Sequence, residues 1–562
     1  MCDRRTRDQS LLIGYDGGGS KSAPRPVMMT GNAQLQFGYH RCADQDARAM
    51  PHHPVIVIGA GPVGLTLALD LARRGIRPVL LDDADRIGEG SRAICFAKRT
   101  LEIFDRLGVA GPMLAKGVVW QKGRVFLEHD EVYAFDLLPE GGHQMPAFIN
   151  LQQYYIERYL VDAIAARDDI DLRWRNKVVG IEHLSDGARL TIDTPDGPYV
   201  LTCDWLVACD GARSSARRHL GLDFAGEVFE DQFLIADVKM KGDFPTERWF
   251  WFDPPFHAGQ SALLHKQPDD VWRIDLQLGP GADAKLERQP ANVIPRIARM
   301  LGHGNFTLEW VSVYTFQCRR LAKFIHNRVV FAGDSAHQVS PFGARGANSG
   351  IQDADNLGWK LAAVLKGAAP ARLIDSYEIE RGQAADENIG HSTRSTDFIA
   401  PRSKMERRFR NAALELAAHT DFAKRFVNSG RLSLPTAYDS PLSTTAEGTF
   451  DGQARVGAPA LDLPMAAMGN GHPWLLSRLG ANFTVLHVGC VSPLVADDGS
   501  DSIRHLAIPL AGDAAAHAAR RYGTKPGVVY VVRPDQHICA RFAAYEPEKV
   551  QAAINRAMGL IG

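Results

Sequence analysis

Short apolar runs alternate with amphipathic stretches from Pro54 onward, and this pattern predicts strands that alternate with helices. The run Val55–Ile58 is fully apolar, as expected of a strand buried on both faces of a parallel sheet. The pattern from Leu65 to Arg74 predicts a helix, and Gly75 suits its C-terminal cap. We expect further strands at 78–81, 171–174, 177–183, 189–193, 205–209 and 328–332, and further helices at 91–107, 154–166 and 350–365.

The character of the chain changes between Phe224 and Phe324. Aromatic residues cluster from Trp249 to Phe256, and apolar and polar residues alternate from Val271 to Leu276. Alternation is typical of half-buried antiparallel strands, so we expect an antiparallel sheet inserted between two halves of the first domain. Beyond 401 the pattern predicts helices up to 426, a Ser/Pro/Thr-rich linker at 433–449, and strands and helices again in the tail, 475–562.

Composition narrows the function classes. The 562 residues include 64 Lys and Arg against 65 Asp and Glu, so no basic surface for a nucleic acid is expected. None of the eight cysteines forms a Cys-x-x-Cys pair, and we expect reduced thiols in a cytoplasmic protein with no metal site. The most apolar run, 55–72, contains three glycines and Asp70, so no membrane span is expected. Residues 1–49 show little periodicity and no secretory signal, which indicates disorder or sequence upstream of a start near Met50.

A glycine motif, Gly59-x-Gly61-x-x-Gly64, lies between the first predicted strand and the first predicted helix. Gly59 permits a tight turn, Gly61 lets the backbone approach a pyrophosphate, and Gly64 lets the helix pack closely on the strand. The helix N-terminus then offers free N–H groups to the phosphate charge. Asp82, or its neighbour Asp83, ends the second strand where a carboxylate can hold ribose hydroxyls. The motif predicts a Rossmann-like dinucleotide-binding domain.

Two further motifs follow later strands. Asp210–Arg217 comes after the strand at 205–209, and Gly333–His337 comes after the strand at 328–332 and continues into the loop Pro341–Gly350. A carboxylate just past a strand end can accept hydrogen bonds from ribose or ribityl hydroxyls. The glycine-rich loop and the helix start offer N–H donors to a polar ring edge.

In this order and at these separations, the three motifs resemble those of the class A flavoprotein aromatic hydroxylases. That family includes para-hydroxybenzoate, phenol and 3-(3-hydroxyphenyl)propionate hydroxylases, and the resemblance covers Val55 to Arg381. It implies that the first motif binds the ADP half of FAD. The second motif then contributes to FAD and NAD(P)H binding, and the third contacts the ribose and ribityl region. Asp82 stands where glutamate is more usual, and Ala344-Arg345-Gly346 stands where Gly-Gln-Gly is usual.

The resemblance also carries over single positions. It implies that Arg92 and Arg99 lie near the pyrophosphate and adenosine, that Gln153, with Glu157 four residues on, lies near the ribityl chain, and that Pro341 packs beside the isoalloxazine. The cofactor-binding candidates are therefore Gly59, Gly61, Pro62, Gly64, Asp82, Arg92, Arg99, Gln153, Asp210, Gly211, Arg217, Gly333, Asp334, Pro341, Gly346, Ala347 and Asn348.

Membership would imply a monooxygenase that uses FAD, NADH or NADPH, and O₂ to hydroxylate a small phenolic or other aromatic substrate through a flavin C4a-hydroperoxide. Such chemistry needs a water-poor pocket, which the aromatic cluster at 249–256 can line. Deprotonation of a phenol would raise ring nucleophilicity, but no catalytic base is evident in the sequence. The candidates are His257, His265, Tyr314 and His337.

Other interpretations stay open. They include a flavin epoxidase, a polyketide hydroxylase or a dehydrogenase of the same fold, and a non-catalytic flavin-binding redox scaffold. His337 is favoured as a structural loop histidine. Arg248 and Arg273 can pair with a substrate carboxylate, although solvated surface arginines are the favoured interpretation. The sequence leaves the choice between NADH and NADPH open.

The tail resembles the thioredoxin-like domain of phenol hydroxylase, through Val531–Asp535 and Ala540-Arg541. Because Cys-x-x-Cys is missing, we expect a structural or dimer-forming role, and a homodimer by resemblance. We therefore expect an α/β protein with a Rossmann-like FAD-binding domain, an inserted antiparallel-sheet substrate domain and a thioredoxin-like C-terminal domain. The expected units are 1–50 (disordered or upstream), 51–225 (FAD-binding, first part), 226–325 (substrate sheet), 326–430 (FAD-binding, second part, and helices), 431–455 (linker) and 456–562 (thioredoxin-like).

Overall fold

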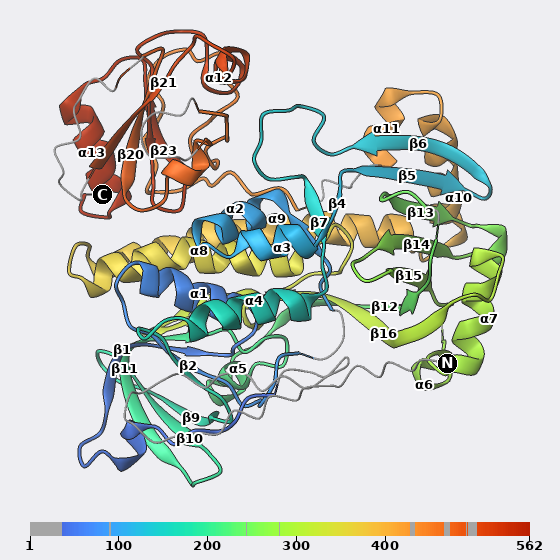
Figure 1. The fold of residues 1–562 in the computed structure, drawn as a ribbon, viewed down its shortest axis with the longest axis horizontal. Helices are drawn as coiled ribbons and strands as arrows, with labels where there is room; N and C mark the ends of the chain where they lie inside the picture. The colour runs from blue at the N-terminus through green and yellow to red at the C-terminus, as the bar shows by residue number, and fades with distance from the viewer. Residues whose placement is uncertain are drawn as a thin grey trace, which may run out of the picture.

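The computed structural model of the chain describes residues 36–88, 92–242, 244–279, 281–427, 433–465, 473–490, 492 and 503–561. Within this part of the chain the strands form two sheets of eight strands, one of four and one of three. In Figure 1 a layer of helices separates the first eight-stranded sheet from the C-terminal sheet, both on the left of the view. The second eight-stranded sheet lies at the right-hand end of the molecule. No helix in the described ranges is long and apolar enough to span a membrane.

The first eight-stranded sheet has a parallel centre, as the apolar run at Val55–Ile58 predicted. β1 pairs in parallel with β2 and β11, and Val55, Ile56 and Val57 are fully buried. The sheet runs in the order β17 (Ile325–His326), β18 (Val329–Phe331), β11 (Tyr199–Ala208), β1 (His52–Ile58), β2 (Val79–Leu81) and β8 (Asp171–Arg173), and β10 (Ala188–Asp193) and β9 (Lys177–His183) extend from β11.

Helices cover this sheet, and α1 packs against both α4 and α8. The predicted helix at 91–107 is wrong in its first half, because Cys95–Ala97 forms a strand that pairs with β7 and the helix begins only at Lys98. The helices of this region are α1 (Pro62–Arg73), α2 (Lys98–Arg106), α3 (Ala110–Lys116), α4 (Gln153–Ala165), α5 (Ser215–His219), α8 (Gly346–Leu365) and α9 (Asp375–Ile399).

The second eight-stranded sheet contains the antiparallel strands predicted between Phe224 and Phe324. The sequence pattern did not predict β5 and β6. These two strands precede β8 to β11 of the first sheet in sequence but belong to the second sheet. Helix α7 (Pro290–Leu301) covers one face, where its Val293 and Ile297 pack with Trp272. The order is β19 (His337–Gln338), β16 (Thr307–Arg320), β12 (Ala225–Lys239), β15 (Val271–Gln277), β14 (Ser261–Lys266), β13 (Arg248–Phe252), β5 (Lys122–Leu127) and β6 (Asp130–Asp136).

A small antiparallel sheet is formed by segments that flank β5 and β6 in sequence, and it contacts the second large sheet. It has the order β3 (Cys95–Ala97), β7 (Phe148–Asn150) and β4 (Val118–Trp120). Asn150 at the end of β7 donates from Nδ2 to the carbonyl of Lys266 in the second sheet, at 2.8 Å. This contact fixes β7 against the end of β14.

The segments at either end of the chain pack more closely than the sequence predicted. Residues 1–35 lie outside the described residues, but Phe37 is buried and stacks on Trp174 at 4.4 Å, so expected disorder does not extend over 36–49. In the expected linker, Tyr438 and Ser440 are buried against α9. The thioredoxin-like assignment of the tail stays a prediction.

The C-terminal part contains a four-stranded sheet, β21-β20-β22-β23, in which β20 and β21 are parallel and the other pairs antiparallel. Two helices, α10 and α11, come before it in sequence, within the stretch predicted to be helical. The elements are α10 (Lys404–Ala417), α11 (Asp421–Val427), β20 (Phe483–Val488), β21 (Ile503–Ile508), α12 (Ala515–Tyr522), β22 (Val529–Val532), β23 (Ile538–Phe542) and α13 (Pro547–Ala557).

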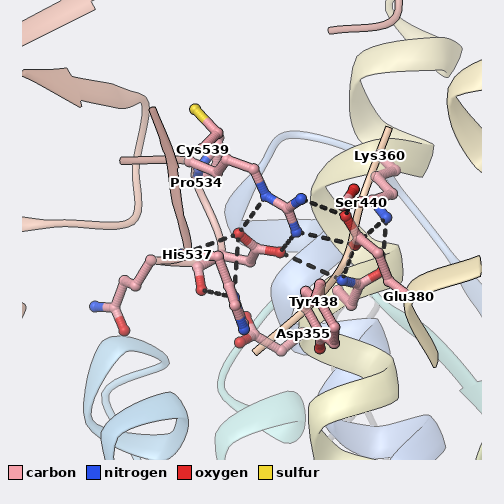
Figure 2. Close-up of polar contacts among 12 residues, drawn as sticks. Asp355, Lys360, Glu380, Tyr438, Ser440, Pro534, His537 and Cys539 are labelled. Atoms are coloured by element: carbon pink, nitrogen blue, oxygen red, sulfur yellow. Dashed lines mark hydrogen bonds and ion pairs between the residues drawn. The ribbon is translucent and has the colours of Figure 1, made fainter. Parts of the chain in front are cut away.

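A buried ionic cluster joins this sheet to the helix layer, and Figure 2 shows it from α8 and α9 to the segment around Pro534. Arg533 donates to both oxygens of Glu380 on α9, at 2.5 and 3.0 Å, and pairs with Asp535. Lys360 on α8 donates to Glu380 at 2.8 Å. We call these four residues the clamp, because they connect α8, α9 and the C-terminal sheet.

Candidate active site

The three motifs found in the sequence meet at one edge of the first sheet. Gly59 follows β1 directly, Asp210 follows β11, and Gly333 follows β18. These strands are neighbours and run parallel, with Ile58 beside Ala208 and Ala208 beside Phe331. The loops at the carboxyl ends of parallel strands are where α/β proteins bind nucleotides.

The glycines of the first motif have the conformations that their proposed roles require. Gly59 has φ of 102°, and a Cβ on it would lie 2.5 Å from the carbonyl oxygen of Cys209. A Cβ on Gly64 would lie 2.0 Å from the carbonyl oxygen of Gly59. A Cβ on Gly61, in contrast, meets no atom within 4 Å, and Pro62 starts α1 directly after it. The start of α1 is therefore open on the side where the sequence predicts a pyrophosphate.

Asp82 lies at the end of β2, beside the glycine turn. Its carboxylate accepts hydrogen bonds from the backbone N–H groups of Ala60, at 2.6 Å, and Ala84, at 2.8 Å. Burial raises the pKa of this carboxyl. Asp82 therefore fixes the turn that would hold the phosphates, while its predicted contact with ribose stays a prediction. Asp83 is exposed.

The second motif is tied to the third through Arg217. One guanidinium nitrogen of Arg217 donates to the carbonyl of Ser335 at 2.9 Å, and the group lies 3.9 Å from the ring centre of Phe224. Asp210 accepts from the N–H of Ala216 at 3.0 Å, and its other carboxylate oxygen is buried without a partner among the described residues. Gly211 has φ of 72°, which favours glycine at this turn.

In the third motif, Gly333 brings the chain close to the first helix. Its φ is 66°, and a Cβ on it would lie 2.9 Å from Val63 on α1. Its N–H donates to Asp353 on α8 at 2.8 Å. The Asp334 side chain is exposed, although surrounding protein still raises the pKa of its carboxyl by desolvation. Asp334 is therefore open to a partner from outside the chain.

The loop after the third motif ends at the N-terminus of α8, a 20-residue helix with no side-chain cap. Pro341, which is exposed, begins a turn that closes with a hydrogen bond from Ala344 N–H to its carbonyl at 3.0 Å. Gly346 and Ala347 form the first helical residues and are half-buried. Uncapped N–H groups at a long helix start suit an electron-rich ring edge.

Two residues of this loop form hydrogen bonds to other parts of the chain through their side chains. Arg345, at the position where the family usually has glutamine, is buried and donates to Asn388 on α9 at 2.9 Å. The Asn348 side chain accepts from Ala97 N–H and Thr100, and donates to the carbonyls of Cys95 and Ala344. The Asn348 side chain therefore holds α8 against β3 and α2, and its predicted contact with the cofactor stays a prediction.

Gln153 and Glu157 hold the loop between β2 and β3 against α4. Gln153 accepts from Ala93 N–H at 3.1 Å and donates to Glu157 at 2.7 Å, and Glu157 accepts from Gly88 N–H at 2.7 Å. Arg92 in this loop is exposed, and its charge acts on both Glu157 and Asp334. The structure thus brings Arg92 towards the third motif.

Arg99, a predicted cofactor contact, has several partners within the chain. Its side chain is 2% exposed and donates to Asp355, at 3.0 Å, to Gln536, and to the carbonyl of Asp535. These partners lie on α8 and in the C-terminal part. Arg99 therefore extends the interface around the clamp, and its predicted contact with FAD stays a prediction.

The four candidates for a catalytic base lie apart. His337 is buried, and its Nε2 lies 2.7 Å from Asp353, which supports the structural interpretation. His257 contacts the carbonyl of Gln277 at 2.6 Å, and burial lowers its pKa. Tyr314 is half-buried on β16 beside Phe233. His265 is buried on β14, next to Arg248 and Arg273.

The aromatic cluster at 249–256 divides between the two faces of the second sheet. Trp249, Trp251 and Phe256 pack on the side of α7, whereas Phe250 and Phe252 lie on the opposite face. Arg248 and Arg273 share that opposite face and are 4% and 3% exposed, so the favoured interpretation as solvated arginines is wrong. Asp275 was not among the residues predicted from the sequence, although strand alternation places it on the same face as Arg273.

The comparisons with known proteins agree with this geometry. A family model described as "FAD binding domain" matches residues 52–392. A "Flavin-dependent monooxygenase" of Mycobacteroides abscessus is 31% identical over 467 residues, which cover 79% of this chain and 90% of the relative. A "3-(3-hydroxy-phenyl)propionate/3-hydroxycinnamic acid hydroxylase" of Escherichia coli K12 is 28% identical over 444 residues, 78% of each protein.

A solved structure shares the fold over most of the chain. The flavin-dependent monooxygenase PieE, solved in complex with FAD and substrate, superposes with a TM-score of 0.75 over 91% of this chain and 99% of that chain, at 21% identity. The chain therefore belongs to the FAD-binding-domain family of flavin-dependent monooxygenases, as the resemblance of its three motifs to the class A aromatic hydroxylases predicted.

Proposed function

We propose that this protein is an FAD-dependent, NAD(P)H-consuming monooxygenase that hydroxylates a small phenolic or other aromatic compound. The observation that carries the proposal is the meeting of three motif loops at one sheet edge, beside the uncapped N-terminus of α8. Relatives named flavin-dependent monooxygenase and 3-(3-hydroxy-phenyl)propionate/3-hydroxycinnamic acid hydroxylase support the same chemistry.

Each part of the site has a role in this proposal. The Gly59–Gly64 turn and the start of α1 would bind the pyrophosphate of FAD, and Asp334 would accept hydrogen bonds from ribityl hydroxyls. The start of α8 would donate backbone N–H groups to the polar edge of the ring. Arg217 keeps the second and third motifs in register through its bond to Ser335.

FAD, when bound, supplies the redox chemistry with NAD(P)H and O₂. The chain supplies positioning and exclusion of water, for which Phe233, Phe250, Phe342 and Tyr314 form an apolar cluster on one face of the second sheet. NADH against NADPH, the homodimer and the cytoplasmic location stay predictions.

The first test is the visible spectrum of the purified full chain. We expect a yellow protein with the absorption of oxidised flavin. Gly61→Val should lose the flavin because its side chain fills the space in front of α1. Gly111→Val is a matched control, because a Cβ there also meets no atom within 4 Å but lies on α3, away from the motifs.

Turnover is tested next, by following NADH or NADPH consumption across a panel of phenols with and without catalase. Consumption that one phenol accelerates, with a hydroxylated product, supports oxygen transfer. A colourless protein that cannot be reconstituted with FAD contradicts the proposed function.

A further inference from the structure

Polar side chains of α9 hold the loop that joins the third motif to α8. Asn388 accepts from Arg345 at 2.9 Å and donates to the hydroxyl of Ser349 at 3.3 Å. Further along α9, Ser392 donates to the carbonyl of Ser340 at 3.1 Å. All of these residues are buried, so their polar atoms depend on one another for partners.

Arg381 lies two turns before Asn388 on the same helix and contacts both the loop and α8. Its Nε donates to Asp353 on α8 at 2.5 Å. One terminal nitrogen donates to the hydroxyl of Ser349 at 2.8 Å and to the carbonyl of the same residue at 3.1 Å. Ser349 belongs to the first turn of α8, so Arg381 holds the start of that helix directly.

Asp353 links Arg381 to the third motif. One carboxylate oxygen accepts from the N–H of Gly333 at 2.8 Å and lies 2.7 Å from Nε2 of His337, and the other accepts from Arg381. Burial would raise the pKa of this carboxyl, but His337 and Arg381 outweigh burial and lower it. The ionised carboxylate therefore holds the turn of the third motif against α8 and α9.

Tyr438 adds a contact from the segment that leads to the C-terminal sheet. Its phenolic oxygen accepts from the remaining terminal nitrogen of Arg381 at 2.8 Å. The buried ring stacks on His537, between β22 and β23, at 4.6 Å between ring centres. Each guanidinium nitrogen of Arg381 thus has a partner. We call Arg381, Asp353, Ser349 and Tyr438 the α9 network.

The α9 network and the clamp use neighbouring residues of one helix, because Glu380 directly precedes Arg381. The segment around Tyr438 contacts both of them, since Tyr438 accepts from Arg381 and Ser440 donates to Glu380. The packing of this segment and the position of the Arg381 guanidinium are therefore connected by direct contacts.

Two parts of the proposed flavin site depend on the α9 network. Gly333 directly precedes Asp334, whose exposed carboxylate is proposed to accept from ribityl hydroxyls. Ser349 lies in the turn of α8 whose backbone N–H groups are proposed to face the polar edge of the ring. Arg381 holds the first part through Asp353 and the second through Ser349. Because hydrogen bonds of charged groups are strong and directional, a change at Arg381 moves both parts.

We propose that Arg381 is a positioning residue for the flavin, which fixes the third motif relative to the start of α8, and that Tyr438 holds Arg381 in this position. The inference rests on the proposed function, because the site that is positioned is that of FAD. Arg381 acts through Asp353 and Ser349 and does not itself contact the cofactor. FAD binding and the packing of the segment around Tyr438 are thereby coupled, so each strengthens the other.

The test compares the FAD affinity of full-length variants, by fluorescence titration of the flavin-free protein with FAD. Tyr438→Phe removes one hydroxyl and keeps the ring that stacks on His537. Its dissociation constant for FAD should rise about three- to thirtyfold. Tyr530→Phe is the matched control and should bind FAD as wild type does, because its buried hydroxyl donates to the carbonyl of Tyr522 at 2.8 Å, outside the α9 network.

The midpoint potential of the bound flavin is measured on the same variants, because a shifted flavin environment changes it and a loss of fold stability alone does not. Tyr438→Phe should shift this potential. Arg381→Lys keeps the charge but loses the planar fork, so it should weaken FAD binding at least as much as Tyr438→Phe. Arg381→Met should weaken FAD binding further, and the difference between the two variants measures how far the charge alone rescues the site.

The outcomes separate the inference from the proposed function. Weaker FAD binding and a shifted midpoint potential in Tyr438→Phe, with Tyr530→Phe unchanged, support the inference. Equal dissociation constants and potentials in wild type, Tyr438→Phe and Arg381→Lys overturn the inference and leave the proposed function standing. Equal losses in both tyrosine variants also overturn it, because they would reflect stability alone. If Arg381→Lys does not fold, Tyr438→Phe decides. A wild-type chain that binds no FAD overturns the proposed function itself.

Discussion

The clamp contrasts with Arg248, His265 and Asp275, which lie on the face of the second sheet opposite α7 and are called the open end. Both are largely buried sets of ionisable groups, but their charges are balanced differently. In the clamp, Arg533 and Lys360 both contact Glu380, and no buried polar atom of its four residues lacks a partner. At the open end, Arg248, His265 and Asp275 each keep an unpartnered polar atom. A complete network explains how two parts of a chain are held together, whereas an incomplete one leaves polar atoms free for water or a ligand.

The two regions also shift the pKa of their carboxyl groups in opposite directions. Burial alone would raise the pKa of Glu380, but the charges of Arg533 and Lys360 outweigh it and hold the pKa far below its usual range. Burial raises the pKa of Asp275 to about 6, because the opposing charges of Arg273 and Arg248 act more weakly. The carboxylates of the clamp therefore stay ionised well below neutral pH, whereas Asp275 takes up a proton as the pH falls through about 6.

Breaking the clamp should have the largest effect on stability. Glu380→Gln keeps the shape but leaves Arg533 and Lys360 without their shared buried anion. We expect the free energy of unfolding to fall by about 3–5 kcal/mol, as for other buried pairs that lose one partner. Urea denaturation followed by circular dichroism measures this change.

The control for the clamp is an ion pair at the surface. Glu447→Gln removes the partner of Lys549, whose side chain is 42% exposed. Its effect should stay below about 1 kcal/mol. If both variants lose similar stability, the clamp does not hold the C-terminal sheet to the helix layer.

The pH dependence of the open end should be the next largest effect. The pKa of Asp275 is raised from 3.8 to about 6. The folded protein thus holds this proton more tightly than the unfolded chain does. Its contribution to stability is complete below pH 3.8 and is lost as the pH rises through about 6. Two pKa units correspond to about 2–3 kcal/mol.

Asp275→Asn removes that titration. Relative to the variant, wild type should lose about 2–3 kcal/mol of unfolding free energy between pH 4 and pH 7, measured by urea denaturation at both values. The sign is opposite for the clamp, where Glu380 has a lowered pKa and loses its contribution only as the pH falls below 4.5. If the difference in unfolding free energy between wild type and Asp275→Asn is the same at pH 4 and pH 7, the pKa of Asp275 is not raised by folding.

The contrast also explains which parts of the molecule the sequence could predict. The β1 strand, the glycine turn and α1 follow one another within 22 residues, so local pattern and backbone geometry determine them. Gly59 has the positive φ of the tight turn expected at its position, and Gly64 allows the close packing of α1 on that turn. The proposed cofactor edge is thus largely readable from the sequence.

Partners far away in the sequence explain what could not be predicted. Arg99 donates to Gln536, which lies 437 residues further along the chain, and nothing local indicates that contact. Strand alternation puts Arg273 and Asp275 on one face, but it does not say that this face is covered. That Arg248 is 4% exposed follows from long-range packing, in which the small sheet contacts β14 through Asn150 and brings Cys95 within electrostatic reach of Arg248.

The smallest expected change in unfolding free energy comes from replacing Arg248, and it distinguishes the open end from the clamp most directly. Arg248→Met replaces a buried guanidinium, whose Nε and Nη1 have no acceptor among the described residues, with an apolar side chain of similar length. Because the charge is desolvated without compensation, we expect the free energy of unfolding to stay unchanged or to rise by about 1–2 kcal/mol. Arg533→Met in the clamp should lower it by about 3–5 kcal/mol, since it leaves Glu380 and Asp535 unpaired.

Urea denaturation of the two methionine variants at neutral pH decides between these signs, with Arg299→Met as an exposed control expected within about 0.5 kcal/mol of wild type. A loss in Arg248→Met as large as that in Arg533→Met would mean that Arg248 stabilises the folded chain through a partner of its own. Retained or increased stability would instead mean that the buried guanidinium contributes no net stability to the folded chain. Such a result would place Arg248 among groups that lower stability, as is common at functional sites.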